Sequence, residues 1–134
     1  MEVLPERERA FKLVYSVQKS KEVTEEQFEL VCKTYNISSR KGKKYMKDIF
    51  FGVNEHEEEI NKMISDSLKS GWTIERISTI DLALLKIAIY EIIYKKTDYK
   101  IVINEAVELA KNYSEEFSPK FINGVLAKIV KNLE

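Results

Sequence analysis

Residues 78–94 are STIDLALLKIAIYEIIY, a strongly apolar stretch that contains no glycine and no proline. Its apolar residues fall on nearly every side of a helix, which predicts a helix that is buried all round at the centre of the molecule. Ser78 and Asp81 have the spacing of a capping box, in which each side chain satisfies a backbone N–H of the other residue. The central helix is therefore expected to begin at this pair.

On both sides of this stretch, apolar residues recur every three or four positions, which is the period of an amphipathic helix. The pattern predicts a long third helix that runs from after Ser39 to Leu68, and a last helix with Ser118 as its N-cap. Gly52 lies inside the third helix, and Asn123-Gly124 lies inside the last one. Both glycines are expected to permit close helix packing, because an interior glycine otherwise weakens a helix. Further helices are expected at about Pro5 to Lys19, from Thr24, and around Ile103.

The fold class expected is therefore all-α, a compact bundle of six or seven helices that forms a single domain over residues 1–134. Lysine plus arginine equals aspartate plus glutamate, at 22 each, so the chain as a whole has no basic excess. A nucleic-acid-binding protein usually has such an excess. Any basic surface must be local, which favours nucleic-acid binding together with a partner.

The single cysteine, Cys32, cannot form an internal disulfide, which fits a reducing cytoplasm. It lies in an apolar helical pattern, so we interpret it as a small buried residue and not as a catalytic thiol. The start of the chain lacks the apolar region of a signal peptide, and no apolar run approaches the length of a membrane span. We expect a cytoplasmic protein that does not contact a membrane.

No constellation of residues indicates an enzyme, and no catalytic residue, metal site or cofactor is expected. The only histidine, His56, lies in the charged run 55–59, EHEEE, whose side chains point in different directions around a helix. They cannot converge on one metal ion, so a solvated face is the better interpretation. The chain has no glycine-rich phosphate loop and no Ser/His or Cys/His set.

Four segments together resemble the NusB family. They are RERAFKLVY at 7–15, GWTIERISTIDLALLKIAIYE at 71–91, VINEAVELAK at 102–111 and SPKFINGVL at 118–126. The resemblance implies two small helical subdomains and a role in transcription antitermination during ribosomal RNA synthesis. It also implies a heterodimer with NusE, a small-subunit ribosomal protein, that grips single-stranded boxA-type RNA in the transcription elongation complex. The resemblance is also compatible with a homodimer, since some members of the family are homodimers.

The first helix is a candidate RNA-binding element. Arg7, Phe11 and Tyr15 are spaced i, i+4, i+8 and therefore share one face, to which Arg9 and Lys12 add charge. Cations meet phosphates, and rings stack on unpaired bases. The alternative is that Phe11 and Tyr15 pack against the second subdomain.

The last helix offers a second RNA-binding candidate, Lys120 and Phe121, which the resemblance places on the RNA side. Core packing is the alternative for Phe121. The densest basic cluster, residues 40–44 together with Lys47, either extends the RNA track or is simply solvated.

Three charged residues of the central helix are candidates for binding the partner protein. The resemblance places Asp81 on the surface that meets NusE, although its capping role needs no partner. Lys86 and Glu91 interrupt the apolar pattern, and a buried charge must be paired. They are either edge contacts to NusE or partners of other helices within the chain.

Two other functions are compatible with the sequence. The neutral charge and the few arginines of the first helix would suit a module that binds only protein. NusB-like domains are also found fused to ribosomal RNA methyltransferases, but we do not expect a catalytic domain here, because the sequence ends at Glu134 after its last predicted helix.

Overall fold

The computed structural model describes residues 8, 10–12, 14–15, 24–34 and 40–133, and these residues form helices, turns and loops without any strand. Residues 8, 10–12 and 14–15 are helical and precede α2. The all-α class is confirmed. The elements are α2 (Glu25–Thr34), α3 (Arg40–Glu55), α4 (Glu57–Asp66), the 3-10 turn η1 (Ile74–Arg76), α5 (Thr79–Ile89), the π turn η2 (Tyr90–Tyr94), α6 (Tyr99–Tyr113) and α7 (Ser118–Leu133).

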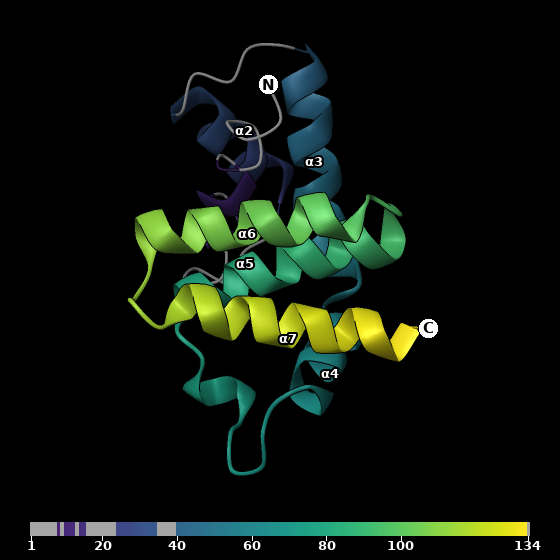
Figure 1. Ribbon diagram of the computed structural model, residues 1–134. Helices are drawn as coiled ribbons and strands as arrows, with labels where there is room; N and C mark the ends of the chain where they lie inside the picture. Colours follow the sequence, from purple (N-terminus) through teal and green to yellow (C-terminus); the bar gives the residue numbers. More distant parts are fainter. Residues whose placement is uncertain (1–7, 9, 13, 16–23, 35–39, 134) are drawn as a thin grey trace.

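Helix α5 is the buried centre of the molecule, as its sequence predicts. Figure 1 shows it between α6 and α7, and it also packs against α4. Every residue from Ala83 to Tyr90 is buried. The helix begins where the capping box predicts, because the Ser78 hydroxyl accepts a hydrogen bond of 3.1 Å from the backbone N–H of Asp81. None of the helices within the described ranges is both long and apolar enough to cross a bilayer.

The prediction of one long third helix is wrong, because the chain bends at His56 between α3 and α4. The backbone of His56 has φ −105° and ψ 18°, outside the helical region. Its ring stacks on Tyr94 of η2, with the ring centroids 3.8 Å apart. His56 is therefore half-buried against η2 and is not a simple member of a solvated face. The stacked ring fixes the bend against the end of the central helix.

The close approach predicted at Gly52 is confirmed, although the neighbour is a ring and not a second helix backbone. A β-carbon added at Gly52 would lie 2.2 Å from Cζ and from the hydroxyl oxygen of Tyr90. That hydroxyl donates a hydrogen bond of 2.8 Å to Asp48. Burial and this hydrogen bond raise the pKa of Tyr90.

The buried apolar residues form two clusters. The larger cluster joins the first helical residues with α3 to α7. Within the described ranges, the smaller one contains Phe28, Cys32, Met46 and Phe50, from α2 and α3. Cys32 is 2% exposed, and burial raises the pKa of its thiol, which confirms it as a buried residue.

Candidate nucleic-acid interface

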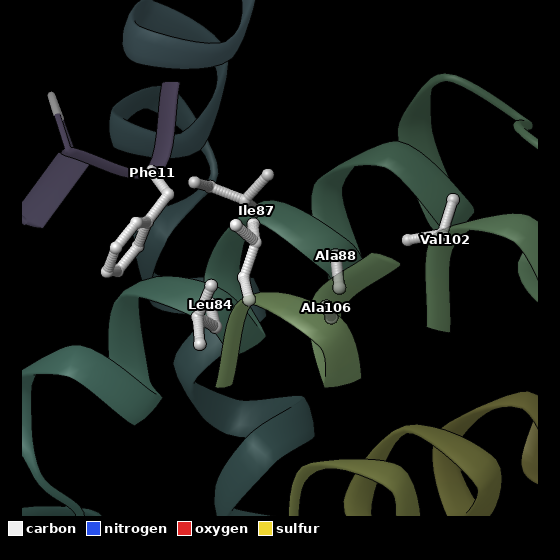
Figure 2. Close-up of a pocket in the computed structure, with 7 residues that line it drawn as sticks. Phe11, Leu84, Ile87, Ala88, Val102 and Ala106 are labelled. Atoms are coloured by element: carbon white, nitrogen blue, oxygen red, sulfur yellow. The ribbon is translucent and has the colours of Figure 1, made fainter. Parts of the chain in front are cut away.

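Phe11 belongs to the core and does not offer its ring to RNA. Its side chain is 3% exposed and lies against Leu84 and Ile87 of α5 (Figure 2). The cavity left among these apolar side chains is about 10 Å³, which is too small for a ligand. The expectation that Phe11 stacks on a base is therefore corrected, because neither face of its ring is open.

Lys12 and Tyr15 lie at the edge of this packing and are half-buried. The ammonium of Lys12 is 5.4 Å from the centre of the Tyr113 ring and 3.9 Å from the carboxylate of Glu8. The Tyr113 hydroxyl donates a hydrogen bond to the same carboxylate, which raises the pKa of Tyr113. Lys12 and Tyr113 therefore lie side by side at the Glu8 carboxylate, and Tyr15 stacks on the neighbouring Phe11 with the ring centroids 6.2 Å apart. Arg7 and Arg9 lie outside the described residues.

Asp81 holds the start of α7 against the start of α5. Its carboxylate accepts a hydrogen bond of 2.6 Å from the hydroxyl of Ser114 and one of 2.7 Å from the hydroxyl of Ser118. The two serine hydroxyls are themselves 2.9 Å apart. We call these three residues the Asp81 clasp. The position of Asp81 in the first turn of α5 also suits a negative charge.

The clasp corrects two expectations. Asp81 is only 1% exposed, so it cannot contact a partner protein directly in this conformation. The Ser118 hydroxyl donates a hydrogen bond to Asp81 and is not the N-cap acceptor of α7. The helix does begin at Ser118, as predicted. Asp81 is a positioning residue. It does not reach the surface itself, and it affects the surface only by holding the turn that precedes α7.

The other two candidates for partner binding are also buried, which corrects their placement on a partner surface. Lys86 is 5% exposed, and its ammonium lies 3.2 Å from the carboxylate of Glu57 on α4. Glu91 is 3% exposed and accepts a hydrogen bond of 3.2 Å from the Tyr45 hydroxyl on α3. The alternative interpretation, that these charges pair with other helices of the chain, is confirmed.

Lys120 and Phe121 lie in the first turn of α7, just beyond the clasp. Lys120 is exposed, and Phe121 is half-buried. The ring of Phe121 lies 5.9 Å from that of Trp72, which is 44% exposed and has the Arg76 guanidinium over its ring at 5.9 Å. The cations of Lys120 and Arg76 and the rings of Trp72 and Phe121 are therefore close together beside the start of α7.

The basic cluster at the start of α3 is separate from this arrangement. Two of its lysines pair with acids of α2, Lys47 with Glu25 at 2.9 Å and Lys43 with Glu29 at 3.7 Å. Figure 1 shows the start of α3 at the far end of the molecule from α7. The cluster is solvated and partly neutralised, and it does not extend the surface around Lys120.

The Asp81 clasp connects the two candidate RNA-binding regions. Tyr113, which contacts Lys12, is followed directly by Ser114. The Ser114 hydroxyl donates to the same Asp81 carboxylate as the hydroxyl of Ser118, two residues before Lys120. We call these two regions together, Lys12, Tyr15 and Tyr113 on one side of the clasp and Lys120 and Phe121 on the other, the basic aromatic face. Local cations beside partly open rings suit a single strand of RNA. Within the described ranges, no three His, Cys, Asp or Glu side chains converge on a possible metal position.

Three aromatic residues near this face were not identified from sequence: Trp72, Phe117 and Tyr113. The i, i+4 spacing of Phe117 and Phe121 places both rings on one side of α7, and it was the available signal for Phe117. Trp72 and Tyr113 come from a loop and another helix end, and only the fold brings them to the face.

A model of the NusB family matches residues 4–131 of the chain. The chain belongs to the NusB family. The NusB transcription antitermination protein of Acetivibrio thermocellus is 43% identical over 126 residues, which cover 93% of this chain and 86% of that protein. The NusB protein of Pediococcus pentosaceus is 39% identical, over 93% of this chain and 94% of the relative.

Solved structures of NusB proteins have the same fold. A crystal structure of the antitermination factors NusB and NusE in complex with double-stranded RNA contains a chain that matches with a TM-score of 0.88 and 29% identity, over 98% of this chain and 99% of that one. The solution structure of NusB from Aquifex aeolicus matches with a TM-score of 0.82 and 31% identity, over 96% of this chain and 86% of the other. The NusB resemblance seen in the sequence is thereby confirmed.

Proposed function

We propose that this chain is a transcription antitermination factor that binds boxA-type single-stranded RNA as a heterodimer with a NusE-type ribosomal protein. The observation that carries the proposal is the basic aromatic face, in which Lys120 and Phe121 are joined to Lys12 and Tyr113 by the Asp81 clasp. The similarity to a NusB chain from a complex with NusE and RNA supports the choice of partner. That complex holds double-stranded RNA, whereas open rings favour unpaired bases.

In this proposal the chain works in the cytoplasm as a single domain and carries out no chemistry of its own. Its contribution is to hold cations and rings in a fixed arrangement for RNA. The net charge of zero means that long-range attraction to RNA is weak. The partner therefore supplies part of the RNA-binding surface, and RNA affinity is expected mainly in the heterodimer.

Phe121→Ala is expected to weaken RNA binding by the heterodimer by about 1–3 kcal/mol, the usual contribution of one stacked base. Lys120→Gln should remove one phosphate contact. The negative slope of log affinity against log salt should therefore become shallower by about 0.7. The measurement is a titration of labelled boxA-type RNA with this chain, with the NusE-type protein, and with both. Lys100→Gln, an exposed lysine at the other end of α6, is the matched control.

Equal RNA affinity for Phe121→Ala, Lys120→Gln and the unchanged chain would place RNA on another surface. RNA binding that stays absent even in the heterodimer would contradict the proposed function. A module that binds only protein would then be the correct interpretation.

A further inference from the structure

We propose that a groove beside the basic aromatic face binds the continuation of the same RNA strand. The groove lies between α7 and the loop that follows α4, and it encloses about 600 Å³. We call it the α7 groove and define it by Lys69, Trp72, Phe117, Lys120, Gly124 and Lys128. The inference rests on the proposed function, because Lys120 and the neighbouring Phe121 belong to both surfaces.

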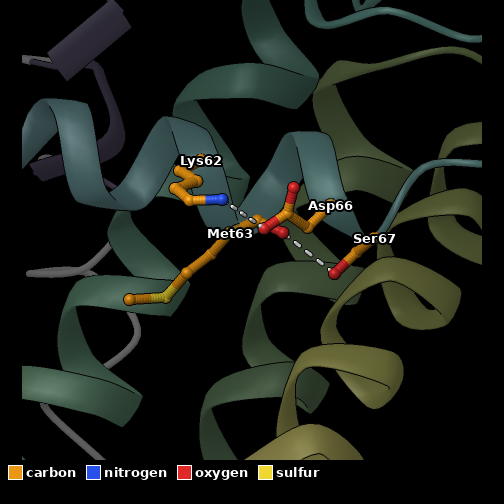
Figure 3. Close-up of polar contacts among 4 residues, drawn as sticks. All are labelled: Lys62, Met63, Asp66 and Ser67. Carbon is orange, nitrogen blue, oxygen red and sulfur yellow. Dashed lines mark hydrogen bonds and ion pairs between the residues drawn. The ribbon is translucent and has the colours of Figure 1, made fainter.

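The charges along the α7 groove favour a polyanion over a protein segment. Lys69, Lys120 and Lys128 line it, and none of its described lining residues is acidic. The nearby Asp66 is paired with Lys62 at 3.0 Å, as Figure 3 shows, so its charge is largely compensated. A cleft lined by charges of one sign concentrates ligands of the opposite sign.

Two aromatic rings in the groove are open enough to stack on bases. Trp72 is 44% exposed and Phe117 is 57% exposed. Exposed rings of this size that take no part in the core are typical of binding surfaces. In single-strand binding sites, stacking on such rings supplies affinity while lysines follow the backbone. The α7 groove contains both kinds of residue in one place.

The groove lies along one side of α7. Phe117, Lys120, Gly124 and Lys128 follow one another at intervals of three or four residues, so they form a stripe along the helix. From Lys120 to Lys128 this stripe extends for roughly 12 Å, given the rise of a helix. A strand that contacts Lys120 can therefore continue along α7 to Lys128.

Gly124 gives the groove an open floor. A β-carbon added there would meet nothing within 4 Å, so the expectation that Gly124 permits close helix packing is wrong. A glycine inside a helix lowers its stability, and no packing contact requires one here. Glycine also allows a ligand to approach the backbone closely. Ligand binding explains this glycine, and helix packing does not.

The wall of the groove opposite α7 is fixed by its own hydrogen bonds. At the end of α4 the Ser67 hydroxyl donates a bond of 2.9 Å to the carbonyl of Met63 (Figure 3). The backbone N–H of Trp72 donates a hydrogen bond of 3.0 Å to the backbone carbonyl of Lys69. In this turn Gly71 has a φ of +89°. A positive φ at that position favours glycine. The groove is thus formed before RNA arrives, which lowers the entropy lost on binding.

Gly124→Leu tests the groove, because its β-carbon would meet no described atom within 4 Å and its longer side chain would extend from an exposed position of α7. The added side chain would block the floor, and RNA affinity of the heterodimer should fall on the order of tenfold, the effect of losing one stacked base. The matched control is Asn104→Leu, at an exposed position of α6 that does not line the groove. Thermal unfolding checks that both variants keep the fold.

Trp72 provides an independent readout, because it is the only tryptophan of the chain. Adding the boxA-type RNA to a heterodimer whose partner has its tryptophans replaced by phenylalanine should quench the Trp72 emission. The quenching should be lost in Gly124→Leu and kept in Asn104→Leu. Lys128→Gln should reduce the magnitude of the salt slope by about 0.7, whereas Lys100→Gln should not.

The outcomes separate this inference from the proposed function. If the unchanged heterodimer binds RNA and Gly124→Leu binds it equally well, the groove is not an RNA site, although the function stands. If Gly124→Leu weakens capture of the NusE-type protein and leaves RNA binding at saturating partner unchanged, the groove binds protein and the inference is overturned. If the unchanged heterodimer does not bind RNA, both proposals fail.

Discussion

Asp81→Ala is expected to lower the free energy of unfolding by about 3 kcal/mol. The substitution removes the acceptor of two short hydrogen bonds, from Ser114 and Ser118, and leaves the fully buried Ser118 hydroxyl with fewer partners. Hydrogen bonds to a charged group contribute about 1.5–3 kcal/mol each, and a buried donor left without its acceptor adds to the loss. Urea denaturation followed by circular dichroism measures the change.

Ser78→Ala is the matched control for Asp81→Ala. It removes the hydroxyl that caps α5 but leaves the Asp81 carboxylate in place, so it should lower stability by only about 1 kcal/mol. Equal effects of the two variants would contradict a clasp. Asp81→Lys is not a clean test of partner binding, because a lysine at a position that is 1% exposed would disturb the fold itself.

The Asp81 clasp also predicts an indirect effect on RNA affinity. Asp81→Asn keeps the shape of the side chain but weakens both hydrogen bonds, so the start of α7 should be held less firmly. RNA affinity should fall while the salt slope stays unchanged, because no phosphate contact is lost. A changed salt slope would mean that Asp81 lies at the RNA itself.

Gly52→Ala is expected to lower the free energy of unfolding by about 1–3 kcal/mol, the usual range for overpacking a core. The new methyl group would lie 2.2 Å from the Tyr90 ring. That ring is 6% exposed and is held by its hydrogen bond to Asp48, so it has little room to move. The melting temperature of the variant measures the loss.

The chain contains its own control for this prediction, since Gly124 is also inside a helix. Gly124→Ala should raise stability by about 0.5–1 kcal/mol, because alanine favours the helix and its β-carbon meets no neighbour. Opposite signs at the two glycines are the expected result. A stabilising Gly52→Ala would contradict the contact with Tyr90.

The helices of this protein could largely be predicted from local patterns, because each pattern reflects which face is buried. The apolar run of α5 and the cap at Ser78 are both properties of neighbouring residues. The bend at His56 could not be predicted in this way. The apolar period continues across it from Val53 to Ile60, and what fixes the bend is Tyr94, which lies far along the chain.

The site was less predictable, because exposure depends on what other segments place nearby. Asp81 occupies a first turn, where an acid is favourable whether it is exposed or buried. Ser114 and Ser118 arrive from the turn between α6 and α7 and bury it. In the same way, α5 buries Phe11, while Trp72 comes to lie beside Phe121 from a loop.

The division of the buried side chains into two unequal clusters has a consequence for local unfolding. Among the described residues, the cluster of Phe28, Cys32, Met46 and Phe50 is small, and the contacts of α2 with other described elements are mainly with α3. Segments with few buried contacts open at lower free energy than the global transition. The amide hydrogens of α2 should therefore exchange with solvent well before those of α5, through an opening that leaves the basic aromatic face assembled.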